Sequence, residues 1–254
     1  MRKISLVFLF SLSLHTVFAQ KTIKVLSFNI LHGATTKGDF DLDHIAKVIS
    51  DADPDFVAMQ EVDFKTKRAK NYDLATELGW RTKMAPLFGK AMNYDGGAYG
   101  EAVLSKTSIL SSHTVALPAQ QGHEPRAALA VTTVLASGDT LTFIGTHLDH
   151  LRDETDRIWQ VNAINEAFAT HPYPAILAGD LNAQPSSKAI QILKHNWTAS
   201  DLDEKPTFPS GEPKRKIDYV LYAPQQKWRV VSTKVINDPI ASDHCAFLVE
   251  LELL

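Results

Sequence analysis

A carboxylate and a carboxamide stand two positions apart where an apolar run of the sequence ends. The run occupies residues 175–179, and Asp180 and Asn182 follow it. Side chains two positions apart share a face of an extended chain, so we expect Asp180 and Asn182 to point together and Leu181 to turn towards the core. Gly179 leaves room for a close approach of neighbouring chain. Oxygen-bearing groups at a strand end suit a divalent cation, an attacking water or a phosphate. The alternative is an Asx-turn that merely closes the strand.

Polar residues with the same chemistry end several other strand-like segments. The carboxyl ends of strands that point the same way lie along one edge of a sheet, where ligand sites form. Carboxylates with carboxamides favour a hard cation such as Mg²⁺ or Mn²⁺, and imidazoles could move protons. Without a Cys/His ligand pattern, zinc is the weaker hypothesis. The full set is Asn29, Glu61, His147, Asp180, Asn182, Asp218, Asp243 and His244.

Hydrophobic periodicity predicts the elements that must position this set. Strands are expected at residues 22–31, 56–61, 101–105, 126–135, 140–148, 175–180, 217–222, 229–235 and 245–251. Helices are expected at residues 41–51, 72–78, 153–169 and 187–195. Strands that alternate with helices and then follow one another indicate an α/β fold with mixed sheets and helices outside. The chain has 254 residues, 44% of them hydrophobic, and no linker-like stretch, so we expect one domain over residues 20–254.

The first residues have the form of a signal peptide. Arg2 and Lys3 precede an apolar run over residues 4–18, and a small residue, Ala19, stands before the expected cleavage site at Gln20. Residues 1–19 are therefore predicted to direct export to the periplasm or the extracellular space. The alternative is an uncleaved membrane anchor. No second long apolar run exists, so we expect no stable membrane insertion, and the mature protein is expected to be a monomer.

Charge argues against a duplex-binding surface. The formal net charge is −3, and loss of Arg2 and Lys3 with the signal peptide takes it to about −5. Sequence-independent DNA binding draws its affinity from Lys and Arg on phosphates, so nucleic acid is a possible but disfavoured partner. A basic cluster at residues 65–70 is interpreted as a solvated loop. A second cluster, at residues 214–216, precedes Asp218 and is left open between a loop and a site role.

Six short motifs together resemble, in the right order, those of the endonuclease/exonuclease/phosphatase superfamily, typified by pancreatic deoxyribonuclease. The resemblance runs from Lys24 to Leu251. It implies a four-layer α-β-β-α sandwich of two mixed β-sheets with helices outside, and a metal-dependent phosphoester hydrolase. The motifs are Phe28-Asn29, Gln60-Glu61-Val62, Thr146-His147-Leu148, Gly179-Asp180-Leu181-Asn182, Ile217-Asp218-Tyr219 and Ser242-Asp243-His244.

The resemblance implies a metal site and an acid–base site. Glu61 matches the principal ligand of a Mg²⁺ or Mn²⁺ ion, Asn29 matches a residue that holds metal or phosphate, and Asp243 matches a carboxylate near the metal. The number of ions, one or two, is left open.

The remaining motif residues match catalytic positions. Asp180 matches the acid that orients or deprotonates the attacking water, and Asn182 the neighbour that steadies it. His147 matches a donor to a phosphoryl oxygen, and His244 a histidine that contacts the scissile phosphate. Asp218 matches the carboxylate that orients a catalytic imidazole. The implied reaction is an in-line attack of water with no covalent enzyme intermediate.

Three further residues have weaker matches. Tyr99 and Glu101 align with a tyrosine and an acid of the deoxyribonuclease branch, and Arg126 belongs to a Glu-Pro-Arg motif of small secreted members. Tyr99 and Arg126 are candidate substrate contacts, and Glu101 is either a second histidine partner or a strand-start residue. Asp218 could therefore serve His147 while Glu101 serves the other histidine. His32 and His150, which adjoin motif residues, could line the pocket.

The sequence thus predicts a secreted metal-dependent phosphodiesterase or phosphomonoesterase. The alternatives are a nuclease that acts on DNA or RNA and a ligand-binding module that has lost catalysis. The loops around the shared site set specificity in such folds, so sugar phosphates, phospholipid headgroups and nucleotides all remain candidate substrates.

Overall fold

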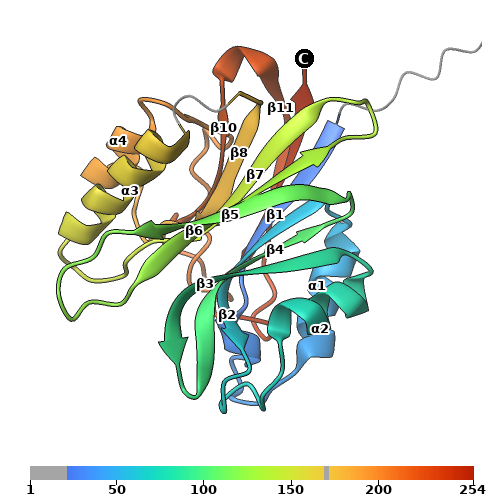
Figure 1. Cartoon of the computed structure of the whole chain (residues 1–254), viewed down its shortest axis with the longest axis vertical. Helices are drawn as coiled ribbons and strands as arrows, with labels where there is room; N and C mark the ends of the chain where they lie inside the picture. The colour runs from blue at the N-terminus through green and yellow to red at the C-terminus, as the bar shows by residue number, and fades with distance from the viewer. Residues whose placement is uncertain (1–21, 169–171) are drawn as a thin grey trace, which may run out of the picture.

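A computed structural model describes residues 22–168 and 172–254 of the chain (Figure 1). The predicted signal peptide and the last residue of the helix predicted at 153–169 lie outside these ranges. Within them, no helix is long and apolar enough to cross a membrane.

The strands of the described residues form two six-stranded mixed sheets. In the first sheet β1 and β2 are parallel and the other neighbours antiparallel, in the order β11-β12-β1-β2-β4-β3. Its strands are β1 (Thr22–Asn29), β2 (Phe56–Phe64), β3 (Ala85–Tyr94), β4 (Gly97–Ser105), β11 (Trp228–Ile236) and β12 (Ala246–Leu253).

In the second sheet β7 and β8 are the parallel pair, in the order β5-β6-β7-β8-β10-β9. Its strands are β5 (Ile109–Leu117), β6 (Arg126–Val134), β7 (Thr140–His147), β8 (Ala175–Asp180), β9 (Thr198–Ala199) and β10 (Asp218–Ala223).

Helices cover the two outer faces of the stacked sheets (Figure 1). The first sheet carries α1 (Leu42–Ala52) and α2 (Leu74–Thr82), and the second carries α3 (Thr155–Phe168) and α4 (Lys188–Leu193). Short 3-10 turns, η1 (Leu31–Gly33) and η2 (Gln225–Lys227), complete the fold. Asp41, Asp73 and Ser187 each accept a backbone N–H in the first turn of α1, α2 and α4, which explains where these helices begin. The four-layer α-β-β-α sandwich is confirmed.

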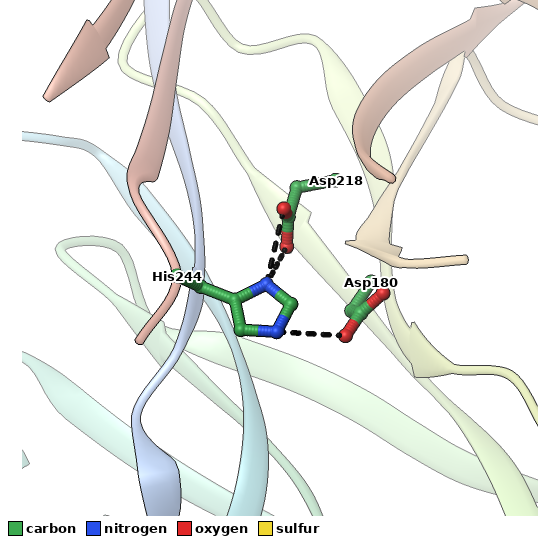
Figure 2. A group of neighbouring side chains, drawn as sticks. All are labelled: Asp180, Asp218 and His244. Carbon is green, nitrogen blue, oxygen red and sulfur yellow. Dashed lines mark hydrogen bonds and ion pairs between the residues drawn. The ribbon is translucent and has the colours of Figure 1, made fainter. Parts of the chain in front are cut away.

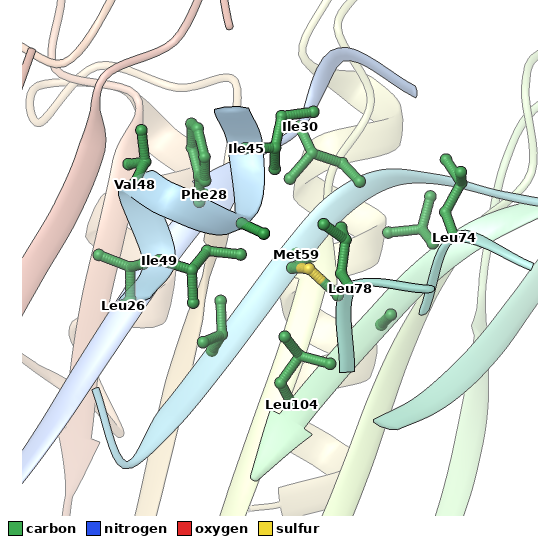
Figure 3. Close-up of a cluster of buried hydrophobic side chains, with 14 of the residues drawn as sticks. Leu26, Phe28, Ile30, Ile45, Val48, Ile49, Met59, Leu74, Leu78 and Leu104 are labelled. Atoms are coloured by element: carbon green, nitrogen blue, oxygen red, sulfur yellow. The ribbon is translucent and has the colours of Figure 1, made fainter. Parts of the chain in front are cut away.

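Apolar side chains fill each of the three spaces between layers. Leu26 and Met59 from the first sheet pack against Ile45 of α1 and Leu78 of α2 (Figure 3). Between the sheets, the ring centroids of Phe56 and Phe143 lie 5.2 Å apart. Burial of such side chains contributes about 25 cal/mol for each Å² removed from water, so these three layers of apolar contacts stabilise the frame that positions the residues at its edge.

Most of the predicted polar residues lie at or next to strand ends that meet at one edge of the sandwich. Glu61 is the exception, because the strand predicted to end there continues to Phe64. His147 at the end of β7 is the register partner of Asp180 at the end of β8, and Asp180 is paired in turn with Asp218 at the start of β10. Asn29 ends β1 in the first sheet, and its amide Nδ2 lies 3.3 Å from Oδ2 of Asp180 in the second. Register within the second sheet and the packing of the two sheets together place residues far apart in sequence within hydrogen-bond reach.

The close approach expected at Gly179 is present in the β7–β8 pair. A Cβ atom on Gly179 would lie 2.0 Å from the carbonyl oxygen of Thr146, far inside van der Waals contact. Only glycine fits there, next to the residue that ends β8.

The sequence missed three strands, all at sheet edges. Much of β3 and β5 is exposed on both faces, so their sequences lack the alternation that marks a half-buried strand. The third, β9, has two residues. In addition, the first strand stops at Asn29 rather than residue 31, because Leu31 and His32 have positive φ angles of 46° and 45° and turn the chain into η1.

Candidate active site

A pocket of about 420 Å³ opens at the edge where the strand ends meet. Three predicted residues, all wholly buried, do not line it. Asn29 and Asp218 contact the lining residues Glu61 and His244, whereas Glu101 makes no side-chain hydrogen bond among the described residues. A larger groove, of about 900 Å³, lies between α1 and α2 around Trp80, away from all of these groups. The predicted site residues that line the pocket are Glu61, Tyr99, Arg126, His147, Asp180, Asn182, Asp243 and His244.

Glu61 reaches the pocket because β2 is irregular at this point. The pairing of β2 with β4 shifts register between Met59 and Val62, and Glu61 has a φ angle of 57°. A bulge of this kind re-aims one side chain out of the alternation of the strand. The Oε1 atom accepts a hydrogen bond from Asn29 Nδ2 at 3.2 Å, and Oε2 lies 3.3 Å from His32 Nδ1. Burial acts to raise the pKa of Glu61, but these two contacts lower it below its usual value, so the carboxylate is charged.

Asp180 closes β8 with a turn, and the extended geometry predicted through Asn182 is wrong. Asn182 has a φ angle of 47°, and its backbone N–H donates to Asp180 Oδ1 at 2.9 Å, which is the Asx-turn alternative. Closing the turn and serving the pocket are compatible roles for Asp180. Its Oδ1 accepts the turn hydrogen bond, while its Oδ2 faces the pocket and lies 3.5 Å from Nε2 of both His147 and His244. Leu181 is fully buried, as predicted. Burial, with the charge of Asp218, raises the pKa of Asp180 to about 7.

His244 lies between two carboxylates (Figure 2). Its Nδ1 is 3.1 Å from Oδ1 and 3.2 Å from Oδ2 of Asp218, and its Nε2 faces Asp180. The Phe208 ring packs 4.6 Å from the imidazole, centroid to centroid. Burial opposes a charged imidazole, but the charges of Asp218 and Asp180 prevail and raise the pKa of His244 to about 10. His244 is therefore an imidazolium at neutral pH.

His147 has the opposite environment. Its Nδ1 lies 2.9 Å from Nη1 of buried Arg126, and its Nε2 lies 3.0 Å from Nδ2 of Asn182. Burial, followed by the positive charge of Arg126, holds the pKa of His147 well below its usual value. The pocket thus contains one charged and one neutral imidazole on either side of Asp180, the kind of contrast that separates acid, base and donor roles.

Asp218 supports His244, which leaves Glu101 without a histidine. Both carboxylate oxygens of Glu101 lack a hydrogen-bond partner among the described residues. Burial raises the pKa of Glu101 well above its usual value, despite the nearby charge of Arg126. The predicted alternative in which Glu101 serves a histidine is therefore not what the structure shows. Tyr99 lines the pocket, and burial strongly raises the pKa of its hydroxyl.

Glu61 and Asp243 offer carboxylate oxygens of the kind that a hard divalent cation prefers. Asn29 could add only its Oδ1 atom, which accepts a hydrogen bond from the backbone N–H of Leu31 at 3.1 Å and has one further lone pair. Burial raises the pKa of Asp243, and Glu61 adds to the rise, although His244 acts against it. Two carboxylates that repel each other across a pocket are a feature that a bound cation relieves. A second group, Asp180, Asp218 and His244, has ligand atoms within 4.8 Å of one another and could also hold a metal ion. In the present arrangement, however, both ring nitrogens of His244 already face a carboxylate.

Sequence reasoning missed part of the pocket wall. His32 and His150 line it as expected, and the second basic cluster contributes Arg215. The first cluster was interpreted as a solvated loop, yet its Arg68 lines the pocket and donates to both oxygens of buried Asp63 at 2.7 and 2.8 Å. Met92, Tyr94 and Phe208 were also missed, because they come from an unpredicted edge strand and a loop. For Tyr94, its position two residues before the Gly96-Gly97 turn was the only feature of the sequence that could have indicated a place in the pocket wall.

A family model described as "Endonuclease/Exonuclease/phosphatase family" matches residues 26–244. The chain belongs to this family. Its members are generally metal-dependent hydrolases, and the buried carboxylate and imidazole groups of this member are consistent with a divalent metal. The family includes phosphatases, nucleases and phosphodiesterases.

Solved structures of the family share the fold at low identity. An endonuclease/exonuclease/phosphatase from Beutenbergia cavernae is 21% identical with a TM-score of 0.77, covering 92% of this chain and 72% of that one. A mannosyl-6-phosphatase from Bacteroides thetaiotaomicron is 19% identical, with a TM-score of 0.73 and coverage of 90% and 99%. The human Nocturnin catalytic domain with bound sulfate is 18% identical, with a TM-score of 0.70 and coverage of 94% and 97%.

Proposed function

We propose that this family member is an exported, Mg²⁺- or Mn²⁺-dependent hydrolase of small phosphoesters. The observation that carries the proposal is the environment of Asp180. Its Oδ2 atom lies 3.5 Å from Nε2 of a neutral imidazole, His147, and 3.5 Å from Nε2 of a charged one, His244. Burial, with the charge of Asp218, raises the pKa of Asp180 to about 7, although the charge of His244 acts against the rise. A carboxylate with such a pKa suits a general base that takes a proton from water.

The residues of the chain divide the work of an in-line displacement. Asp180 orients the water and accepts its proton as the water oxygen bonds to phosphorus and the opposite bond, from phosphorus to the leaving oxygen, breaks. The leaving oxygen keeps the electron pair of that bond and takes a proton from solvent. His244 and His147 donate hydrogen bonds to the phosphoryl oxygens, where negative charge develops. Asn182 adds a further donor. Its Nδ2 atom lies 3.0 Å from Nε2 of His147 and 3.1 Å from the carbonyl oxygen of Leu148.

Glu61, Asn29 and Asp243 would hold the metal ion. When bound, a divalent cation supplies electrostatic stabilisation of the transferring phosphoryl group. Asn29 links the two halves of the site, because its Nδ2 contacts Glu61 at 3.2 Å and Asp180 at 3.3 Å.

Small substrates fit the pocket better than a nucleic acid duplex. A volume of about 420 Å³ matches a metabolite or headgroup, and the formal charge of −3 gives no long-range attraction to a polyanion. The structural similarity to a mannosyl-6-phosphatase supports testing sugar phosphates first.

A phosphate-release screen over sugar phosphates, nucleotides and phospholipid headgroups tests the proposal, with chromogenic monoesters and diesters alongside. We expect turnover on at least one class, loss of that turnover in EDTA and its return with Mg²⁺ or Mn²⁺. An Asp180→Asn variant should lose activity and keep its fold. Absence of turnover on every phosphoester, or turnover that ignores EDTA, would show that the proposal is wrong.

A nuclease is the second candidate, supported by the cations at the mouth of the pocket. Arg215 is exposed, stacks 4.7 Å above the Phe208 ring and has no carboxylate partner among the described residues. Cleavage of single-stranded or duplex DNA that falls steeply with salt would favour this candidate. Undetectable cleavage together with phosphate release from small esters would reject it.

Export and a monomeric state belong to the proposal as well. Sequencing of the N-terminus of protein recovered from the periplasm or medium should give Gln20 as the first residue. Light scattering at micromolar concentration should give the mass of one chain. An intact Met1 in a membrane fraction would instead indicate an uncleaved anchor.

A further inference from the structure

Arg126 is a buried cation at the back of the pocket that binds two histidines. The residue begins β6 and is 3% exposed. Its Nη1 atom lies 2.9 Å from Nδ1 of His147, and its Nη2 atom lies 3.2 Å from Nδ1 of His150 and 3.1 Å from Oε1 of Glu124. A guanidinium in this position contacts the catalytic imidazole from behind.

The hydrogen-bonding capacity of arginine decides the direction of these contacts. A guanidinium carries five N–H donors, has no acceptor and stays protonated in proteins. Nδ1 of His147 must therefore accept, and a neutral ring that accepts at Nδ1 carries its proton on Nε2. The same argument applies to His150.

The amide of Asn182 offers a competing donor on the other side of the ring. Its Nδ2 lies 3.0 Å from Nε2 of His147, and a neutral imidazole cannot accept at both nitrogens. Nδ2 already donates to the carbonyl of Leu148, so its contact with the ring is not needed to satisfy it. If Arg126 prevails, Nε2–H of His147 and the second N–H of Asn182 lie side by side and can share one acceptor, such as a phosphoryl oxygen.

A carboxylate behind His147 would have the opposite effect. An acid at Nδ1 accepts a proton from the ring and favours the imidazolium, as Asp218 does for His244. Glu101, the acid predicted as a second histidine partner, makes no such contact among the described residues. The guanidinium occupies that position and disfavours a charged ring.

We propose that Arg126 is a positioning residue that fixes His147 as the neutral tautomer with its proton on Nε2. His147 then acts only as a hydrogen-bond donor, and proton transfer from the attacking water falls to Asp180. The role of His147 as a donor to substrate rests on the proposed function, but its tautomer does not. An experiment can therefore reject one of these two statements without rejecting the other.

Nitrogen NMR of the histidine rings tests the tautomer without any substrate. The full chain is labelled with ¹⁵N-histidine, and the His147 signals are assigned from the spectrum of His147→Gln. In the wild type at neutral pH we expect an unprotonated Nδ1 and a protonated Nε2. In Arg126→Met, which keeps much of the side-chain length but has no donor, both ring signals should shift towards the mixture of tautomers seen in free histidine. Arg152→Met is the matched control, since Arg152 is exposed and follows His150 by two positions in the sequence, and it should leave the ring signals unchanged.

Three results would overturn the proposal. One is a wild-type His147 that carries its proton on Nδ1, which would mean that Asn182 donates to Nε2. Another is a wild-type ring protonated on both nitrogens. The third is an unchanged His147 tautomer in a folded Arg126→Met variant. If that variant does not fold, the wild-type spectrum alone still decides between Arg126 and Asn182.

Activity adds a separate readout once a substrate is known. Loss of one positioned donor to a transition state lowers kcat by roughly 10²-fold. We therefore expect Arg126→Met to reduce kcat by roughly 10-fold or more with little change in KM. Arg126→Lys, which keeps a charged N–H donor group without the planar guanidinium, should recover part of the loss. A reduction confined to KM would assign Arg126 to substrate binding instead.

Discussion

Nδ1 of His244 lies 3.1 Å from Oδ1 and 3.2 Å from Oδ2 of Asp218, so one buried carboxylate holds one edge of the imidazole with both of its oxygens. Neither residue is next to the other in sequence, and Asp218 is 0% exposed. The contact orients the ring so that its opposite nitrogen, Nε2, faces Asp180. A carboxylate in this position both aims the imidazole and keeps it charged.

Asp218→Asn should therefore impair chemistry without removing the metal site. An amide keeps the shape but not the charge, so the ring loses its orientation and part of its positive charge. We expect kcat to fall by roughly 10²-fold or more, the scale of a positioned acid–base group. Circular dichroism and metal titration should be unchanged.

A double-mutant cycle with His244→Ala shows whether the two residues act as a unit. The effects of Asp218→Asn and His244→Ala should be strongly non-additive, because either change alone removes the function of the pair. Additive effects would mean that Asp218 does not act through His244. Full activity in Asp218→Asn would mean that Asp218 has no part in catalysis.

Glu61→Gln should affect metal dependence. Glutamine keeps the hydrogen-bonding shape towards Asn29 but withdraws the negative charge that suits a divalent cation. The Mg²⁺ or Mn²⁺ concentration for half-maximal rate should rise by roughly 10-fold or more, and isothermal titration of the metal should weaken to match. Asp218→Asn is the control, with low kcat at an unchanged metal requirement. An unchanged metal requirement in Glu61→Gln would assign the ion to the Asp180, Asp218 and His244 group.

The burial of Glu101 should make the free energy of unfolding depend on pH. The pKa of its buried carboxyl is raised in the folded state, so the folded protein binds this proton more tightly than the unfolded chain does. The free energy of unfolding should therefore fall as pH rises above the ordinary glutamate range, about 4.3. Glu101→Gln, a neutral group of the same shape, should unfold at higher urea concentration than the wild type, with the gain growing from pH 5 to pH 8.

The exposed residue Glu166 provides the control for this experiment. Glu166→Gln on α3 should follow the wild-type pH profile throughout. A Glu101→Gln variant that is less stable than the wild type at pH 8 would indicate a charged Glu101 with an undetected partner.

The sequence predicted the residues at the strand ends better than their geometry. Asp180 and Gly179 could be found because a buried strand that ends in a polar residue is visible in sequence. The positive φ of Asn182 was not visible, because Asn is tolerated in both extended and left-handed backbone. The partner of each histidine depended on which strands are neighbours. Only the pairing of β8 with β10 and β7 brings Asp218 and His147 to Asp180.

Arg126 shows a second limit of sequence reasoning. A Glu-Pro-Arg motif indicates that the arginine matters, but not whether it contacts substrate or a histidine. The answer depends on the β6–β7 pairing, which brings the start of β6 beside the end of β7. Arg68 was misinterpreted for a related reason, since its buried partner Asp63 lies in β2 beyond the predicted end of the strand.

Gly179→Ala tests how strongly the site depends on the β7–β8 pairing. The new Cβ would lie 2.0 Å from the carbonyl oxygen of Thr146, so the strands must separate at the register pair that precedes His147 and Asp180. Overpacking of this kind costs about 1–3 kcal/mol of unfolding free energy, and a backbone clash places the variant at the upper end. Because the displacement occurs next to Asp180, the proposed general base, kcat should fall by roughly 10²-fold as well.

Gly145→Ala, in the same β7 strand, is the control. The new Cβ would lie 3.4 Å from Ala58 Cβ, its nearest neighbour, and should be accommodated at little cost. Urea unfolding and phosphoesterase rates measure both effects, and a Gly179→Ala variant as stable and active as Gly145→Ala would show that the strand ends do not need this close contact.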